Sequence, residues 1–172
     1  MELVKTTLDG VYIIKPDVFR DFRGDYMMTY HKDTYEALFS KVQWIEHCVS
    51  TSTKNVLRGI HYSPNCWKIY QCLYGKLYYV FVNCDENDPE FGKWESFVID
   101  GKNYWQLVKP PKYGAGFISL TNYSILYYLQ SQYYDADNPD QKTFKWDDPR
   151  FNIFWPIKPI LSRRDEIGNY IS

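Results

Sequence analysis

The chain has 172 residues, a length that predicts one domain, which we place over residues 1–172. Lys and Arg total 20 and Asp and Glu total 21, so the net charge is −1. This balance argues against a nucleic-acid binder and against a polybasic membrane anchor, because both carry a basic excess. Aromatic residues make up 19% of the chain, which excludes disorder. No apolar run is long enough to span a membrane and the first residues lack a signal-peptide core, so we expect a cytoplasmic protein.

Short strands and one helix are predicted along the chain. The helix spans 33–39, with Asp33 as its candidate N-cap. Aromatic and β-branched runs between turn residues predict strands at 11–14, 56–62, 68–73, 77–82, 94–99, 116–120 and 125–134. Their close spacing, without alternation of strand and helix, predicts an all-β antiparallel sandwich or barrel. The polar and aromatic stretch after residue 135 is expected to form an irregular tail that wraps back onto it.

The four cysteines, Cys48, Cys66, Cys72 and Cys84, have spacings that fit neither C-x-x-C nor a zinc site. We expect four free thiols in a reducing compartment. Their main role is expected to be that of small, buried apolar side chains.

Two polar residues stand out within the apolar run VLRGIHY at 56–62. Arg58 and His61 are three positions apart, so strict alternation would place them on opposite faces of a strand. Gly59 between them permits a bulge that re-aims one of them. The pair fits a site that binds an anion and moves a proton, and it also fits a hydrogen-bonded core histidine beside a surface arginine.

Other familiar sites are not predicted. No H-x-H is present, and His31 and His47 lie in other segments than His61, so no metal site is expected. The chain has no G-x-S-x-G and no glycine-rich nucleotide loop. The Gly-rich stretch at 110–117 is interpreted as a tight corner between strands.

Several short blocks run through nearly the whole chain. The most specific is LRGIHY at 57–62, and the others are FRG at 22–24, STS at 50–52, FGKW at 91–94, GF at 116–117, YY at 133–134, WDDP at 146–149 and WP at 155–156. Together they resemble the nucleotide-sugar 3,5-epimerases typified by dTDP-4-dehydrorhamnose 3,5-epimerase. The resemblance implies a cupin-like antiparallel jelly-roll barrel with short helices, a homodimer, and no metal or organic cofactor.

The chemistry implied by this resemblance is deprotonation of a nucleotide-linked sugar beside a ketone, then reprotonation from the other face. His61 matches the general base, because a neutral imidazole accepts a proton near pH 7. Asp165 matches the acid that orients this ring. Lys68 matches a cation that stabilises the enolate oxygen, Tyr128 the acid that returns the proton, and Tyr134 a second site tyrosine.

The resemblance also implies the nucleotide contacts. Arg23 and Arg58 match diphosphate ligands, for which a guanidinium fork is well suited. Met28 stands where the family has a glutamate that reads thymine, and a thioether is a weak acceptor. This departure favours a GDP-linked sugar, and in particular a 4-keto heptose of a bacterial capsule pathway, over a dTDP-linked one.

Further departures fall at other positions of the pocket. Glu46, Cys48 and Ser50 occupy the family's Q-x-N-x-S, and we expect all three to contact the substrate. Ala115 stands in place of a family histidine, so that histidine is absent. An epimerase with an altered substrate is therefore the leading hypothesis. The alternatives are a 3,4-ketoisomerase of the same substrate class and a catalytically dead sugar-binding relative.

Overall fold

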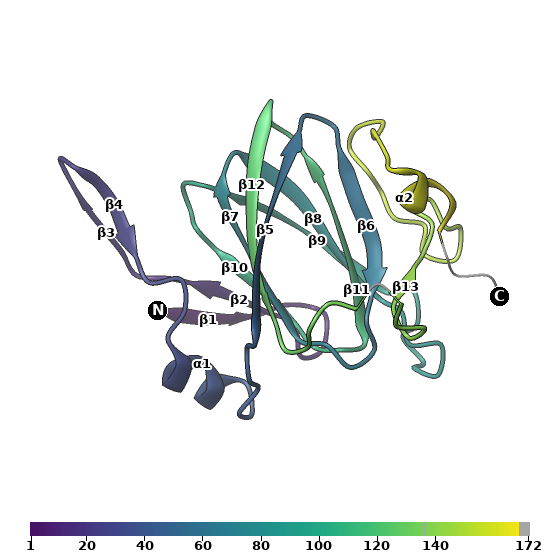
Figure 1. The fold of residues 1–172 in the computed structure, drawn as a ribbon, viewed down its shortest axis with the longest axis horizontal. Helices are drawn as coiled ribbons and strands as arrows, with labels where there is room; N and C mark the ends of the chain where they lie inside the picture. Colours follow the sequence, from purple (N-terminus) through teal and green to yellow (C-terminus); the bar gives the residue numbers. More distant parts are fainter. Residues whose placement is uncertain (136, 169–172) are drawn as a thin grey trace.

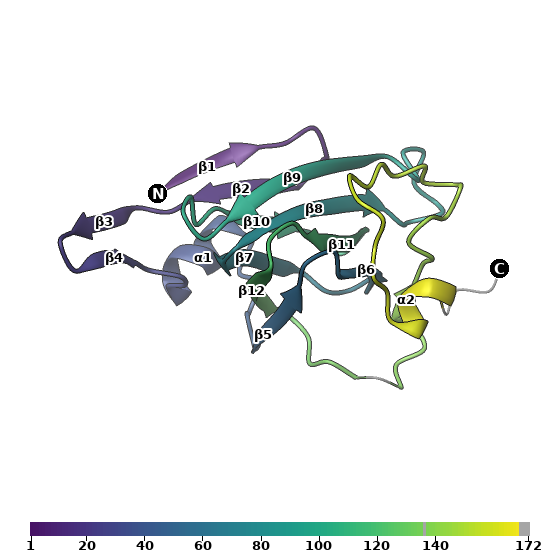
Figure 2. The ribbon, with the colours of Figure 1, turned by 90° about the horizontal axis from the view of Figure 1, so that it is seen from above.

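Two antiparallel sheets face each other and form most of the protein (Figures 1 and 2). A computed structural model describes residues 1–135 and 137–168. The strand order is β1-β2-β10-β7-β12-β5 in the six-stranded sheet and β13-β6-β11-β8-β9 in the five-stranded sheet. In chain order the elements are β1 (Glu2–Lys5), β2 (Tyr12–Lys15), β3 (Val18–Asp21), β4 (Gly24–Met27), α1 (Lys32–Leu38), β5 (Glu46–Thr53), β6 (Leu57–Tyr62), β7 (Lys68–Tyr74), β8 (Lys76–Asn83), β9 (Trp94–Asp100), β10 (Gln106–Lys109), β11 (Tyr113–Ser119), β12 (Tyr123–Gln130), β13 (Lys142–Thr143) and α2 (Arg163–Ile167).

The main core lies between the sheets and is rich in aromatic side chains. Tyr70 of β7 packs against Tyr79 and Phe81 of β8, with ring centroids 4.8 and 5.9 Å apart. Tyr79 also stacks on Phe117 of β11 at 5.5 Å. Alternation along the strands places these rings on the inner faces, so burial of aromatic surface holds the two sheets together.

The outer face of each sheet is covered by a different segment. On the six-stranded sheet, Tyr35 of α1 and the following Phe39 pack against Ile69, Val108 and other apolar side chains. On the five-stranded sheet, Phe144 and Phe151 of the C-terminal tail cover residues of β6 and β8. The tail is fixed further by a backbone bond from Leu57 N–H to the carbonyl of Ile160, 3.0 Å long. The strands at the centre of both sheets are therefore buried on both faces, and their sequences are nearly continuous runs of apolar residues.

The strands predicted from the sequence are confirmed, with ends that differ by no more than four residues. The predicted helix is confirmed over Lys32–Leu38, but Asp33 lies in its first turn and His31 is the N-cap. The stretch at 110–117 is only partly a corner, because β11 begins at Tyr113. The irregular tail is confirmed in its described part, where β13 and α2 are short. The predicted domain 1–172 includes residues 136 and 169–172, which lie outside the described residues, and stays a prediction.

A two-stranded hairpin, β3–β4, stands away from the sandwich (Figures 1 and 2). Phe22 at its turn is 97% exposed, and Phe19 and Tyr26 on its strands are 67% and 70% exposed. An isolated hairpin of this size is marginally stable in water, so these rings form a surface suited to contact with another protein chain.

Neither helix in the described part of the chain has the length and apolar character needed to cross a bilayer.

Candidate active site

A bulge in β6 brings Arg58 and His61 into one pocket, as the glycine between them predicts. His61 pairs with Ala115 of β11, and Arg58 pairs with Phe117. The two paired residues are three positions apart on β6 but only two positions apart on β11, so β6 contains one extra residue. The extra residue falls at Gly59, which has a φ of +127°. Both side chains line a pocket of 240 Å³ between the sheets. Arg58 is exposed, as the alternative expects of a surface arginine, but His61 is exposed as well, so it is not a core histidine.

His61 and Asp165 form a tight pair. Nε2 of His61 lies 2.7 Å from Oδ1 of Asp165, which is 4% exposed. An ionised carboxylate only accepts hydrogen bonds, so Nε2 carries the proton and donates it to Asp165. Nδ1 is left as the nitrogen that accepts a proton.

The C-terminal tail holds Asp165 in place. The Ser162 hydroxyl caps α2 and donates to Oδ2 of Asp165 at 2.8 Å, while the backbone N–H of Gly59 approaches Oδ1 at 3.4 Å. Burial raises the pKa of Asp165, but the hydrogen bond and charge of His61, then Ser162 and Gly59, outweigh it and leave the pKa lowered. Asp165 is therefore ionised at neutral pH, as an orienting residue requires.

Lys68, Tyr128, Tyr134 and Ser50 line the same pocket. The Lys68 ammonium lies 5.9 Å from the centroid of the Tyr128 ring. Burial raises the pKa of Tyr128 well above its usual value, so its hydroxyl stays protonated at neutral pH. Burial lowers the pKa of Lys68. The structure thus brings four of the predicted site residues into one pocket with His61, and His61 and Tyr128 come from opposite sheets. Their chemical roles stay predictions.

Two predicted residues lie beside the pocket and two lie elsewhere. Glu46 and Cys48 do not line it, although Glu46 accepts a hydrogen bond from the lining residue Gln130 at 3.0 Å. Arg23 is at the tip of the β3–β4 hairpin, bonded to Asp21 at 2.6 Å, and Met28 directly follows this hairpin. In a single copy of the chain Arg23 and Met28 do not line the pocket of His61, because the hairpin stands away from the sandwich (Figure 1). Their expected roles in binding the nucleotide stay predictions.

The cysteines differ from the expectation in one respect. All four are free, but only Cys66, Cys72 and Cys84 are buried. Cys48 is half-buried on β5, at the edge of the six-stranded sheet, because no strand covers its outer side. A single thiol thus lies near the pocket with access to solvent.

Sequence reasoning missed two cations. Arg164, next to Asp165, lines the pocket and donates to Oγ1 of Thr143 at 2.7 Å. Lys109 of β10 is 1% exposed and lies directly opposite Lys68 on β7, so both point into the barrel. Its ammonium donates to the carbonyls of Cys66 at 3.1 Å and Pro110 at 3.4 Å. The sequence feature that could have indicated a buried Lys109 is its position directly after the two apolar residues 107 and 108 of the same strand.

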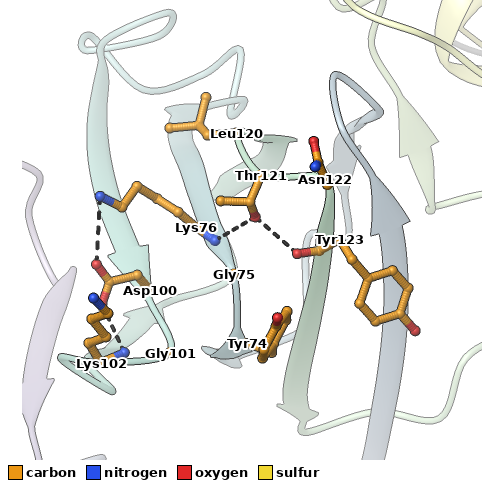
Figure 3. A pocket seen from close by; sticks show the side chains of 10 residues that line it. All are labelled: Tyr74, Gly75, Lys76, Asp100, Gly101, Lys102, Leu120, Thr121, Asn122 and Tyr123. Carbon is orange, nitrogen blue, oxygen red and sulfur yellow. Dashed lines mark hydrogen bonds and ion pairs between the residues drawn. The ribbon is translucent and has the colours of Figure 1, made fainter.

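A larger hollow of 720 Å³ lies at the other end of the strands (Figure 3). Its polar groups are bonded to each other: Lys76 N–H donates to Oγ1 of Thr121 at 3.0 Å, and Thr121 donates to the carbonyl of Tyr123 at 2.9 Å. The ten residues that line it include no histidine and none of the predicted site residues. The smaller pocket, which His61, Tyr128 and Lys68 line together, is therefore the candidate active site.

Comparison with known proteins decides the family. The family profile of dTDP-4-dehydrorhamnose 3,5-epimerase matches residues 5–172. This chain belongs to that family. The dTDP-4-dehydrorhamnose 3,5-epimerase of Shigella flexneri is 32% identical over 173 residues, which cover 98% of this chain and 94% of that protein. The predicted carbohydrate epimerase is thereby confirmed at the level of the family.

Two solved structures of the family have the same fold. The dTDP-6-deoxy-D-glucose-3,5-epimerase of Legionella pneumophila, in complex with dTDP-4-keto-L-rhamnose, is 28% identical with a TM-score of 0.90, over 95% of this chain and 89% of that one. ChmJ, a 3'-monoepimerase of Streptomyces bikiniensis in complex with dTDP-quinovose, is 28% identical with a TM-score of 0.87, over 94% and 84%. The predicted all-β, cupin-like jelly roll is confirmed. These names give no support to the predicted GDP-linked heptose.

Asp165→Asn is expected to reduce the activity of this epimerase by ~10²–10⁴-fold, the usual contribution of a positioned base. An amide at this position donates to Nε2 through its NH2 group and so moves the ring proton to Nδ1, where it blocks proton acceptance. The measurement is the rate of solvent deuterium exchange into substrate. Ser162→Ala, which removes one contact to Asp165 and leaves the carboxylate, is the matched control and is expected to lose far less.

Lys109→Met is expected to stabilise the fold most at neutral and acidic pH. Burial, followed by the charge of Lys68, lowers the pKa of Lys109 to about 7, whereas an unfolded lysine has a pKa of about 10.4. The folded state therefore disfavours the charged form, and the penalty is complete below the folded pKa and gone above the unfolded one. The stability gain is expected to shrink by about 1.4 kcal/mol per pH unit between these values. Denaturant unfolding across this range measures it, with Lys5→Met as the exposed control; a gain that does not change with pH contradicts it.

Proposed function

We propose that this protein inverts C3, C5 or both in a nucleoside-diphosphate-linked 4-keto-6-deoxyhexose. The observation that carries the proposal is the convergence of the His61–Asp165 pair, Lys68 and Tyr128 on one pocket. His61 is on β6 of the five-stranded sheet and Tyr128 is on β12 of the six-stranded sheet. A sugar between the sheets meets a base on one side and an acid on the other, which is the arrangement that inversion requires.

The reaction follows from these positions. Nδ1 of His61 takes the proton from a carbon beside the ketone, and the electron pair moves onto the ketone oxygen. The Lys68 ammonium stabilises this enolate oxygen. Tyr128 then donates its proton to the same carbon from the opposite side, which inverts the centre. His61 returns its proton to water and the Tyr128 phenolate regains one, so the cycle is neutral overall.

The nucleotide is proposed to be dTDP. The pocket of 240 Å³ is smaller than most ligand sites, which span about 300–1,000 Å³, so it suits the sugar rather than the whole substrate. Arg58, at the rim, donates to the Ser52 hydroxyl and the Thr51 carbonyl, which orients its guanidinium for a diphosphate. The relatives named above act on or bind dTDP-linked compounds, and this outweighs the argument for GDP from Met28 alone.

We also propose that the reaction takes place in the cytoplasm, a reducing compartment in which four free thiols are expected.

The two alternatives are less consistent with the pocket. A dead relative has no need of a charged carboxylate buried against a histidine, because an unused buried charge lowers stability. A 3,4-ketoisomerase uses a similar base but returns the proton to a neighbouring carbon, and the facing positions of His61 and Tyr128 favour return to the same carbon. Product NMR separates the two, since isomerisation moves the ketone.

Incubation in D2O with dTDP-linked and GDP-linked 4-keto-6-deoxyhexoses tests the function. We expect one deuteron for each inverted carbon, and turnover of the dTDP-linked sugar faster by about tenfold or more. His61→Asn is expected to lose exchange by ~10²–10⁴-fold. Undiminished exchange in that variant would refute the base, and a wild-type protein that exchanges with neither substrate would refute the function. Mass spectrometry counts the deuterons.

We further propose that the active unit is a homodimer in which the β3–β4 hairpin of one chain reaches the pocket of its partner. The resemblance assigns Arg23 to the diphosphate, yet in its own chain the hairpin stands away from the pocket (Figure 2). The exposed rings of Phe19, Phe22 and Tyr26 give the hairpin the apolar surface that a partner chain would cover. In such a dimer the partner chain covers the exposed rings of the hairpin, and its own hairpin brings Arg23 to the pocket.

Mixing two inactive variants tests the exchange of hairpins. Arg23→Ala and His61→Asn are each expected to be impaired alone. Mixed dimers contain one site with an intact His61 and an intact Arg23 from the partner, so random reassembly is expected to restore about a quarter of wild-type activity. If Arg23 acts within its own chain, each site of every mixed dimer keeps one defect and activity does not return. Native mass spectrometry, which separates dimers whose subunits differ in mass, confirms that the chains have mixed.

A further inference from the structure

Three groups form a line that leads from the pocket to the edge of the six-stranded sheet. Cys48 of β5 lies directly opposite Tyr128 of β12, so both side chains project from the inner face. The interaction between the two groups lowers the pKa of Cys48 and raises that of Tyr128, although burial has the larger effect on each pKa. Beyond them, the Cys48 thiol donates to Oε1 of Glu46 at 3.3 Å. The phenol thus stands opposite a thiol across the strand pair, and the thiol is hydrogen-bonded to a carboxylate.

Glu46 is itself held firmly. Its Oε1 accepts from Nε2 of Gln130 at 3.0 Å, and its Oε2 accepts from the backbone N–H of Tyr134 at 2.9 Å. A carboxylate that accepts from a thiol favours the protonated thiol, and this contact raises the pKa of Cys48 after the effects of burial and Tyr128. The thiol of Cys48 is therefore protonated at neutral pH. Its half-buried position on an edge strand gives it contact with solvent.

Inversion of both carbons, one of the outcomes of the proposed function, creates a need for such a group. Each inversion removes one proton from Tyr128 and leaves a phenolate in the pocket. While the sugar occupies the pocket, the side of Tyr128 that faces it is closed to water. A second inversion without release of the sugar thus requires a proton from the protein side of the phenol, and Cys48 is the group opposite it there.

We propose that Cys48 is a positioning residue that returns a proton to Tyr128 while the sugar stays bound, so that two inversions follow from one binding event. The thiol proton passes to the phenolate, which restores the phenol and leaves a thiolate. The thiolate then takes a proton from water at the sheet edge, and the imidazolium of His61 gives one up to water, so protons balance. This inference rests on the proposed epimerase function and goes beyond it by assigning the reloading step.

The test uses two substitutions at Cys48 and one control. Cys48→Ala removes both the hydrogen bond and the proton. Cys48→Ser keeps a hydrogen bond of similar geometry, but a hydroxyl is a far weaker acid than a thiol. Val49→Ala, at the next position on β5 and on its outer, exposed face, is the matched control. The substrate is a dTDP-linked 4-keto-6-deoxyhexose in D2O, and NMR measures singly and doubly inverted product at early times.

Wild type and Val49→Ala are expected to release mainly doubly inverted sugar with two deuterons. Cys48→Ala and Cys48→Ser are expected to release singly inverted sugar, with the ratio of double to single product lower by about tenfold or more. First-step exchange through His61 is expected to stay within about twofold, which a general loss of structure would not allow. In wild type the ratio is expected to fall as pH rises through ionisation of the thiol, since a thiolate has no proton to deliver.

The opposing outcomes are distinct. A wild-type ratio in Cys48→Ala, or its full recovery in Cys48→Ser, would overturn proton delivery by the thiol. Inversion of a single carbon by the wild type would also overturn this inference while leaving the epimerase intact. Absence of any exchange by the wild type would instead refute the proposed function itself.

Discussion

The close approach of β6 and β11 at Gly59 is the constraint on which the site depends. A Cβ atom at this position would lie 2.5 Å from the Cα of Gly116 and 2.7 Å from the carbonyl oxygen of Ala115. With a φ of +127° as well, only glycine fits. The bulge turns Arg58 and His61 to the same side, and the N–H of Gly59 points at the carboxylate that holds His61. One backbone irregularity therefore positions the base, its partner and a rim cation.

The two-layer fold then separates the two proton-transfer groups. His61 and Tyr128 project toward each other from different sheets, and the aromatic core fixes the spacing between these sheets. The tail has a double role. Phe144 and Phe151 cover the outer face of the sheet that carries His61, and the same tail ends in the short helix that presents Asp165. An irregular segment thus supplies both packing and chemistry, and this explains its length in a domain of this size.

Physical reasoning from the sequence reached some features and missed others for definable reasons. The predicted strands followed from aromatic and β-branched runs between turn residues, and the bulge followed from a glycine between two polar residues. The β3–β4 hairpin was missed because Phe19, Phe22 and Tyr26 are exposed and obey no inside–outside pattern. The pairing of His61 with Asp165 joins positions 104 residues apart, so no local pattern predicts it and only the family resemblance located it. Lys109 was missed because a lysine within the core breaks the usual rule for burial.

Lys109 belongs to a row of polar side chains that crosses the inner face of the six-stranded sheet. Glu46, Gln130, Lys68 and Lys109 lie opposite one another on β5, β12, β7 and β10. The carboxylate is at the edge of the sheet and the buried cation is at its centre, so the row places positive potential behind the pocket. A buried ammonium opposes folding, but it also favours negative charge on a bound sugar. An enolate is such a charge. The groups that conflict most with a stable barrel are therefore the ones that the proposed reaction would use, and this accounts for a polar row inside a largely aromatic core.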